Sequence, residues 1–179
     1  SETGENVLAE FGRGRAPNAA DQAAFVQRAS RKQQAFPKHL RCDVDELPAA
    51  LQRAFGSKLW AQTAQRCYSC GSCNLVCPTC YCFNIRDDIS LDGNCGSRVR
   101  EWDGCQLRDF ALVAGGHNFR PDPAQRLRHR VMRKGRWIQD RTGLLGCVGC
   151  GRCDGACTAK ISIREMFNAL AEEAGDDGA

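Results

Sequence analysis

Cysteines are the residues of this chain whose number and spacing could do chemistry. The 179 residues include 13 cysteines, and eight of these form two runs of the pattern C-x-x-C-x-x-C-x-x-x-C. The first quartet is Cys67, Cys70, Cys73 and Cys77, and the second quartet is Cys147, Cys150, Cys153 and Cys157. Two-residue gaps let one tight loop wrap around a metal centre and present several thiolates to it. The glycine after each second cysteine, Gly71 or Gly151, lets the backbone turn close to that centre.

The spacing within each quartet favours iron over zinc. Structural zinc usually takes its four ligands as two separated pairs. Here four cysteines follow one another with gaps of two, two and three residues, and this run occurs twice. That is the ligand spacing of four-iron, four-sulfur (4Fe–4S) clusters. We therefore expect two 4Fe–4S clusters, with structural zinc as the alternative.

The fourth cysteine of each quartet is expected to point away from its own loop. In two-cluster ferredoxins this cysteine binds the other cluster. Applied to this chain, one cluster has the ligands Cys67, Cys70, Cys73 and Cys157, and the other has Cys147, Cys150, Cys153 and Cys77. This crossover would bring the quartets together across residues 78–146, which separate them in the sequence.

Five cysteines lie outside the quartets: Cys42, Cys80, Cys82, Cys95 and Cys105. Their spacing fits no standard ligand run, so the favoured interpretation is that they are small hydrophobic residues, some packed near a cluster. The alternative is a third metal centre built from Cys80, Cys82 and Cys105, with Cys95 as a further ligand. Cys42 stands alone and is expected to be structural.

Composition places the chain in a reducing compartment. An odd number of cysteines, most of them in ligand runs, argues against a secreted disulfide framework. No run of 18 apolar residues occurs, so we expect no membrane span and a cytoplasmic location. The formal net charge of +4 counts cysteines as neutral thiols. Because ligand cysteines are thiolates, the protein with its clusters bound should be close to neutral.

The elements that must position the quartets are expected to be helices joined by irregular loops. Apolar spacing predicts helices at 21–36, 45–55, 58–66, 105–114, 123–136 and 162–173. Pro37 is expected to end the first of these, Asp122 and Pro123 to open the helix at 123, and the capping box Ser162-x-x-Glu165 to start the last. No sustained two-residue alternation indicates a strand. The expected fold class is mostly α, a helical two-cluster ferredoxin-like domain with irregular cluster-binding loops. The expected organisation is a flexible arm at 1–18, a helical lead-in at 19–66, and a two-cluster domain at 67–174 with an insertion at 78–146.

Other candidate residues are interpreted as structural. The basic run at 126–134 is expected to be a solvated helix face that can also offset the clusters or attract a negatively charged partner. A nucleic-acid patch is the alternative, disfavoured because few aromatic residues accompany the run. We expect His117 to be a turn residue and His129 to be exposed. No phosphate-binding glycine loop and no catalytic constellation occurs, so no catalytic residue is assigned.

Several segments resemble a known family of redox proteins. The run CYSCGSCNLVCPTCYCFNIRD, followed by REWDGC, VAGGHNFR, RLRHRVMRK and CVGCGRC, resembles the iron–sulfur beta subunit of soluble sulfhydrogenase-type nickel–iron hydrogenases. The A subunit of anaerobic sulfite reductases is similar. The resemblance covers about residues 40–172. It implies a relay in which electrons pass from NAD(P)H through a flavin subunit and then this subunit to a hydrogenase or reductase centre.

The leading hypothesis is therefore a non-catalytic electron-transfer subunit of a cytoplasmic redox complex. Its expected partners are a flavin-containing, NAD(P)H-oxidising subunit and nickel–iron hydrogenase subunits, with no nucleic acid. Sulfite reductase subunits are the second choice. A freestanding two-cluster ferredoxin is disfavoured because such ferredoxins are shorter and lack a long basic insertion. A zinc- or cluster-containing nucleic-acid binder is the third class.

Overall fold

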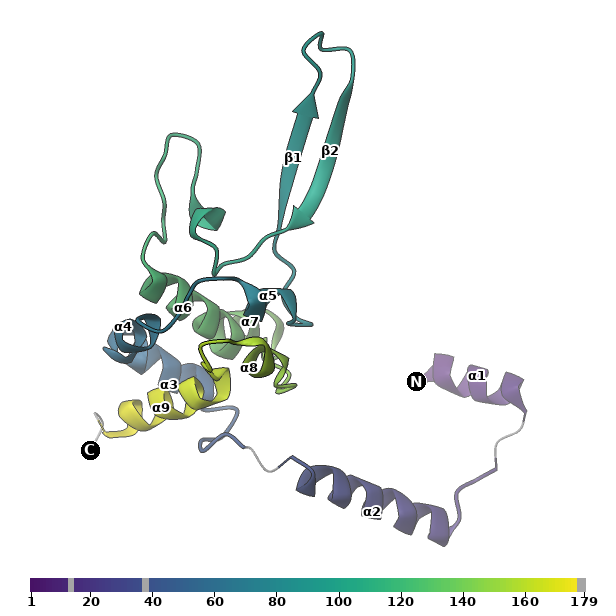
Figure 1. Cartoon of the computed structure of the whole chain (residues 1–179). Helices are drawn as coiled ribbons and strands as arrows, with labels where there is room; N and C mark the ends of the chain where they lie inside the picture. Colours follow the sequence, from purple (N-terminus) through teal and green to yellow (C-terminus); the bar gives the residue numbers. More distant parts are fainter. Residues whose placement is uncertain (13–14, 37–38, 177–179) are drawn as a thin grey trace. The chain divides into compact units, whose positions relative to one another are not determined.

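The computed structural model describes residues 1–12, 15–36 and 39–176, which divide into two compact units, Ser1–His39 and Leu40–Ala179. The first unit has two exposed helices, α1 (Glu2–Phe11) and α2 (Ala19–Gln34) (Figure 1). Helix α1 lies in the segment expected to be a flexible arm. Helix α2 covers most of the predicted helix at 21–36, and Pro37, expected to end it, lies outside the described residues.

The second unit is built on helices that enclose one hydrophobic core. They are α3 (Leu47–Arg53), α4 (Leu59–Ala64), α6 (Pro123–Met132), α7 (Ile138–Thr142) and α9 (Ile163–Asp176), with the 3-10 turn η1 (Ala54–Gly56) after α3 and the π-helical turn η3 (Arg133–Trp137) after α6. Its largest buried side chains include Leu47, Leu51, Trp60, Leu127, Val131, Met132, Phe167 and Leu170. Helix α9 packs along α3, and α4 packs along α6.

The starts of α6 and α9 confirm the capping signals in the sequence. The Asp122 carboxylate accepts a hydrogen bond from the backbone N–H of Ala124 at 2.7 Å, and Pro123 occupies the first turn. The Ser162 hydroxyl accepts one from the N–H of Glu165 at 3.4 Å. These caps fix where α6 and α9 begin, and α9 begins soon after the second quartet in the sequence.

A β-hairpin corrects the expectation of a chain without strands. Strands β1 (Phe83–Ile89) and β2 (Gly96–Trp102) pair antiparallel, with Phe83 opposite Trp102, and project from the helices of their unit (Figure 1). Every residue of both strands is exposed. Since neither face of the hairpin is buried in this chain, the sequence has no pressure to alternate strictly between apolar and polar residues. The fold is thus about half helical with a small two-stranded sheet.

The predicted helix at 105–114 is also wrong. Only the 3-10 turn η2 (Arg108–Ala111) forms there, and an isolated bridge pairs Leu112 with Asn118. Gln106 instead makes two hydrogen bonds to Arg126 of α6. The side-chain amide of Gln106 donates to the backbone carbonyl of Arg126 at 2.7 Å, and the backbone carbonyl of Gln106 accepts from Arg126 Nε at 3.1 Å. Leu107, Leu112 and Val113 are exposed, so the apolar residues of this segment do not mark the buried side of a helix. Among the described residues, no helix is long and apolar enough to cross a membrane.

Candidate metal centres

The two quartets lie on loops with the same backbone shape. Gly71 and Gly151 have φ of +76° and +71°, and each is the N-cap of a short helix, α5 (Ser72–Leu75) or α8 (Arg152–Ala156). Two residues earlier, the equivalent positions Ser69 and Gly149 are also left-handed, with φ of +51° and +67°. The Ser69 hydroxyl accepts a hydrogen bond from Arg126 at 3.1 Å, which helps to hold a non-glycine residue in this conformation. The sequence repeat is therefore a structural repeat.

Helices α5 and α8 pack against each other and bring the two loops together (Figure 1). Each helix carries the third cysteine of its quartet, Cys73 or Cys153. Each is followed by the fourth cysteine, Cys77 or Cys157, whose carbonyl accepts a hydrogen bond from the N–H three residues later. These tight turns direct the chain away from its own loop after the fourth cysteine.

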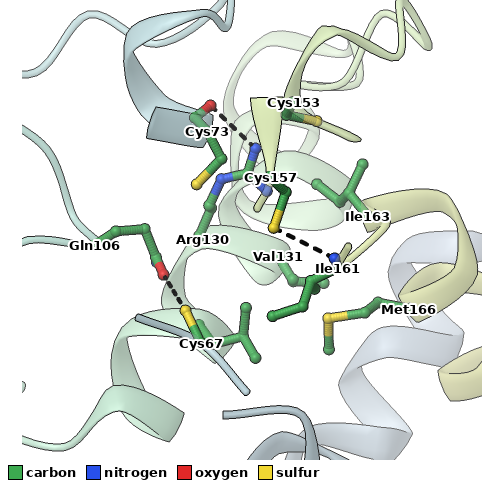
Figure 2. A pocket seen from close by; sticks show the side chains of 11 residues that line it. Cys67, Cys73, Gln106, Arg130, Val131, Cys153, Cys157, Ile161, Ile163 and Met166 are labelled. Carbon is green, nitrogen blue, oxygen red and sulfur yellow. Dashed lines mark hydrogen bonds between the residues drawn. The ribbon is translucent and has the colours of Figure 1, made fainter. Parts of the chain in front are cut away.

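One cavity is lined by sulfurs from both quartets (Figure 2). Its cysteines are Cys67 and Cys73 from the first quartet and Cys153 and Cys157 from the second. The other lining residues are Gln106, Leu127, Arg130, Val131, Ile161, Ile163 and Met166. Cys157 thus lies in the same cavity as two cysteines of the opposite quartet, as a crossover of ligands requires.

The reciprocal pair, Cys77 and Cys147, is also close. The charge of Cys77 contributes to raising the pKa of the Cys147 thiol, after the larger effect of burial. The Thr79 hydroxyl, two residues after Cys77, donates a 2.6 Å hydrogen bond to the carbonyl of Gly146, which directly precedes Cys147. This bond ties the end of the first quartet to the start of the second.

Hydrogen-bond donors surround several of the sulfurs. The backbone N–H of Ile161 donates to Cys157 Sγ at 3.3 Å (Figure 2). The hydroxyl and the backbone N–H of Ser72 lower the pKa of the Cys70 thiol, with the hydroxyl oxygen 3.3 Å from the sulfur. Amide and hydroxyl donors stabilise thiolate charge, and in iron–sulfur proteins they tune the potential of the cluster.

Three buried cations of α6 and η3 face the cysteine loops. Arg126, Arg130 and Lys134 recur every four residues, so they share one side of the helix, and they are only 4%, 5% and 2% exposed. Within the described residues none of them pairs with a carboxylate. The expectation of a solvated basic face is wrong for these three residues. Arg126 donates instead to backbone carbonyls and to the Ser69 hydroxyl, whereas Arg130 and Lys134 interact with quartet sulfurs.

Arg130 lies between the two quartets. Its guanidinium donates to the Cys73 carbonyl at 3.3 Å (Figure 2), and it interacts with the Cys153 sulfur. Burial would lower the pKa of Arg130, but the sulfurs of Cys73 and Cys153 raise it above its ordinary value. Burial raises the pKa of the Cys73 thiol to about 11, and Arg130 opposes this rise. Arg130 therefore supports the thiolate form on both sides of the cavity.

Lys134 plays a similar part beside Cys77. Its ammonium donates to the Thr79 hydroxyl at 2.6 Å, and that hydroxyl lies 3.4 Å from Cys77 Sγ. Burial alone would raise the pKa of the Cys77 thiol. The hydroxyl and N–H of Thr79, together with the charge of Lys134, outweigh burial and lower the pKa to about 7. A pKa below the ordinary value favours the thiolate, the form of cysteine that binds metal.

The donor set fits iron–sulfur clusters better than a single ion. Across the described ranges 1–12, 15–36 and 39–176, no three histidine, cysteine or carboxylate side chains are close enough to hold one metal ion. Zinc bound by thiolates needs Zn–S bonds of about 2.3 Å. A cluster spreads its ligands more widely, and the shared cavity, the N–H donors and the buried cations all suit its negative charge.

The remaining candidates have mixed outcomes. Cys42 packs against the core, whereas Cys95 is exposed in the hairpin turn, away from the other free cysteines of the insertion. His117 lies in an exposed turn, as expected, with its ring 4.6 Å from that of Phe119. His129 is not exposed: it packs on Trp137 at 5.2 Å, and burial, with Arg120 and Arg133, lowers its pKa to about 4.

Comparison with known families follows this geometry. The family described as "4Fe-4S dicluster domain" matches residues 66–161, more than half of the chain and both quartets. The chain belongs to the 4Fe-4S dicluster domain family. It therefore carries 4Fe–4S clusters and is an iron–sulfur electron-transfer protein, as the spacing of its cysteines predicted.

A curated relative of this dicluster protein is Sulfhydrogenase 2 subunit beta of Pyrococcus furiosus. The two are 38% identical over 148 residues, which cover 83% of this chain. The chain spans 43% of the relative's length. The predicted resemblance to sulfhydrogenase beta subunits is confirmed. No solved structure matches the chain.

Sequence reasoning did not identify the buried residues around the sulfurs. Arg130, Lys134, Gln106 and Asn74 are all at most 5% exposed and lie beside quartet or insertion cysteines. The one available signal was the four-residue spacing of Arg126, Arg130 and Lys134. This spacing placed three cations on one side of a helix whose apolar residues showed that it was packed.

Proposed function

We propose that this chain relays electrons through two 4Fe–4S clusters between a flavin subunit that oxidises NAD(P)H and a nickel–iron hydrogenase centre of the sulfhydrogenase type. The observation that carries the proposal is the cavity shared by Cys67 and Cys73 of the first quartet and Cys153 and Cys157 of the second. It joins two cluster sites into one body, and electrons move rapidly only between centres that are close. The name of the Pyrococcus furiosus relative favours a hydrogenase as the terminal partner.

The proposed ligands follow the crossover. One cluster takes Cys67, Cys70, Cys73 and Cys157, and the other takes Cys147, Cys150, Cys153 and Cys77. The cavity supports the first set, and the closeness of Cys77 to Cys147 supports the second. When bound, the clusters supply one-electron redox chemistry. The residues of the chain hold them, donate hydrogen bonds to their sulfurs and offset their charge.

Each proposed cluster site reaches the surface at one ligand. Cys70 and Cys150, the second cysteines of the two quartets, are exposed, whereas the other six quartet cysteines are partly buried. An electron donor and an acceptor can therefore each approach one cluster while the remaining ligands stay protected. A relay needs this arrangement, with one contact for each partner.

We place the relay in the cytoplasm, without catalytic residues of its own and without a nucleic-acid partner. Thirteen free cysteines suit a reducing compartment. The buried side of the basic helix faces the quartets, which accounts for three of its cations without a nucleic acid.

The test is to interrupt the relay at Cys150 in the assembled complex. The Cys150→Ala variant should lose NAD(P)H-linked hydrogen turnover. Reduction of an artificial dye at the flavin site should survive, and so should hydrogenase activity driven by an artificial donor. Cys95→Ser, which changes an exposed cysteine in the hairpin turn, is the matched control and should behave as the wild type.

Assembly must be verified by gel filtration, because folding can depend on a bound metal centre. Normal NAD(P)H-linked turnover in an intact Cys150→Ala complex would contradict the relay. NAD(P)H oxidation or hydrogen evolution by the isolated chain would contradict it as well. Anaerobic copurification with sulfite reductase subunits, and with no hydrogenase, would replace the proposed terminal partner.

A further inference from the structure

Three cysteines that belong to neither quartet converge beside helix α5. The amide nitrogen of Asn74 lies 3.6 Å from Cys80 Sγ and 3.5 Å from Cys105 Sγ, so these two sulfurs are at most about 7 Å apart. Cys82 is close enough that Cys105 and Cys80 both contribute, after burial, to raising the pKa of its thiol. The three cysteines come from two segments separated by the whole hairpin.

The fold brings these cysteines together at the base of the hairpin. Cys82 directly precedes β1 and Cys105 follows β2, and the N–H of Asp103 donates to the Cys82 carbonyl at 3.4 Å. Cys80 is held by a 3.2 Å bond from its N–H to the carbonyl of Cys77. Strand pairing therefore fixes two of the cysteines, and the turn after the first quartet fixes the third.

Cations and N–H donors surround this trio. Arg130 interacts electrostatically with Cys80, and Arg133 and Lys134 with Cys82. Both Asn74 contacts run from an amide N–H to a sulfur, the same kind of donation that Ile161 makes to Cys157. Cations and N–H donors around cysteines stabilise the deprotonated form that binds metal.

Asn74 is buried beside this trio. The residue is 5% exposed, and its Oδ1 atom is buried without a hydrogen-bond partner in the described part of the chain. Gly104 leaves the space that Asn74 fills, since a Cβ at Gly104 would lie 3.0 Å from Asn74 Oδ1. This packing holds the Asn74 Nδ2 donor beside the two sulfurs.

The spacing of the trio points to a cluster. The Cys80 and Cys105 sulfurs, at most about 7 Å apart, are within reach of one cluster. We propose that Cys80, Cys82 and Cys105 bind a third iron–sulfur cluster beside the first quartet, with the Asn74 amide at its edge. This site goes beyond the relay through the quartet clusters, and Cys95 takes no part in it because it lies in the exposed hairpin turn.

Iron and acid-labile sulfide content of the full chain, reconstituted without oxygen, tests this site. The quartets alone account for about eight irons per chain, and the third cluster should raise the wild type to about twelve. The double variant Cys80→Ala/Cys82→Ala should fall to about eight irons. Both changed residues are only partly buried, so the substitution should leave the fold intact. Cys42→Ser and Cys95→Ser are the controls and should retain the wild-type iron content.

Two results would overturn the third cluster. One is about eight irons in both the wild type and the double variant. The other is one zinc per chain that only the double variant loses. Failure of the quartet clusters gives a different pattern, because Cys150→Ala would then leave the iron content unchanged while the double variant lost iron. Circular dichroism of each variant verifies its fold.

Discussion

Arg130 is the residue on which the electrostatics of the quartets depend most. It is 5% exposed, lies between Cys73 and Cys153, and has no carboxylate partner among the described residues. A cluster gains negative charge on reduction, so a nearby buried cation stabilises the reduced state more than the oxidised state. Arg130 should therefore raise the reduction potential of the clusters.

The variant Arg130→Gln should lower the midpoint potential of at least one cluster. A unit charge at roughly 5–10 Å and an effective dielectric constant of about 20 corresponds to a fall of roughly 70–140 mV. Arg130→Lys keeps the charge and should restore most of the potential. Arg128→Gln is the control, because Arg128 lies on the same helix but stacks over Phe55. A redox titration in which Arg130→Gln and Arg128→Gln have equal potentials would refute this role.

Ligand crossover makes a second prediction at the residue scale. Replacing Cys77 by Ser should perturb the cluster of the second quartet, because the bond from Thr79 to Gly146 ties the end of the first quartet to the start of the second. The spectrum of that cluster should change while the cluster at Cys67, Cys70 and Cys73 keeps its signal. The complementary variant Cys157→Ser should do the reverse. Spectroscopic damage confined to the variant's own quartet would show that each quartet binds its own cluster.

At the scale of elements, the sequence predicted helices better than the segments between the quartets. Capping residues and apolar spacing located α6 and α9 well, because both helices bury one side in the core. The hairpin and η2 were not predicted. The hairpin is exposed on both faces, and the apolar residues Leu107, Leu112 and Val113 around η2 are exposed as well. The spacing of apolar residues predicts an element when one side of that element is buried and the other is exposed. It predicts little for a segment that is not buried on one side.

The glycine spacing of the quartet loops could be predicted, but the burial of their cations could not. Gly71 and Gly151 are left-handed where a close turn was expected. The basic run at 126–134 looked solvated, because basic residues are usually exposed. Arg126, Arg130 and Lys134 are buried because two cysteine loops, distant in the sequence, close over one side of the helix.

The π-helical turn η3 offers a test of how this helix is held. Gly135 sits against the core, and a Cβ there would collide with Leu51 and lie 2.8 Å from Phe167 Cε1. Gly135→Ala should therefore lower the free energy of unfolding by about 1–3 kcal/mol. Gly56→Ala, where a Cβ meets nothing within 4 Å, is the control. Urea unfolding under anaerobic conditions measures both, and equal midpoints would show that η3 is not tightly packed.

At the scale of the whole molecule, the second unit is a scaffold that holds two repeated loops face to face. One side of α6 packs into the core with α3, α4 and α9, and the other side of α6 presents cations to the quartets. The two units have separate structures, and the quartets lie entirely within Leu40–Ala179. Electron transfer through this chain thus depends on how close the loops hold the two clusters.

The most direct test of this account is a redox titration of the anaerobically purified chain, monitored by electron paramagnetic resonance. We expect at least two one-electron reductions. The spectrum at intermediate potential should be that of an isolated reduced 4Fe–4S cluster. At full reduction the spectrum should broaden, because two paramagnetic clusters in adjoining sites interact magnetically. A single reduction step, or a fully reduced spectrum that is the plain sum of independent clusters, would contradict the account.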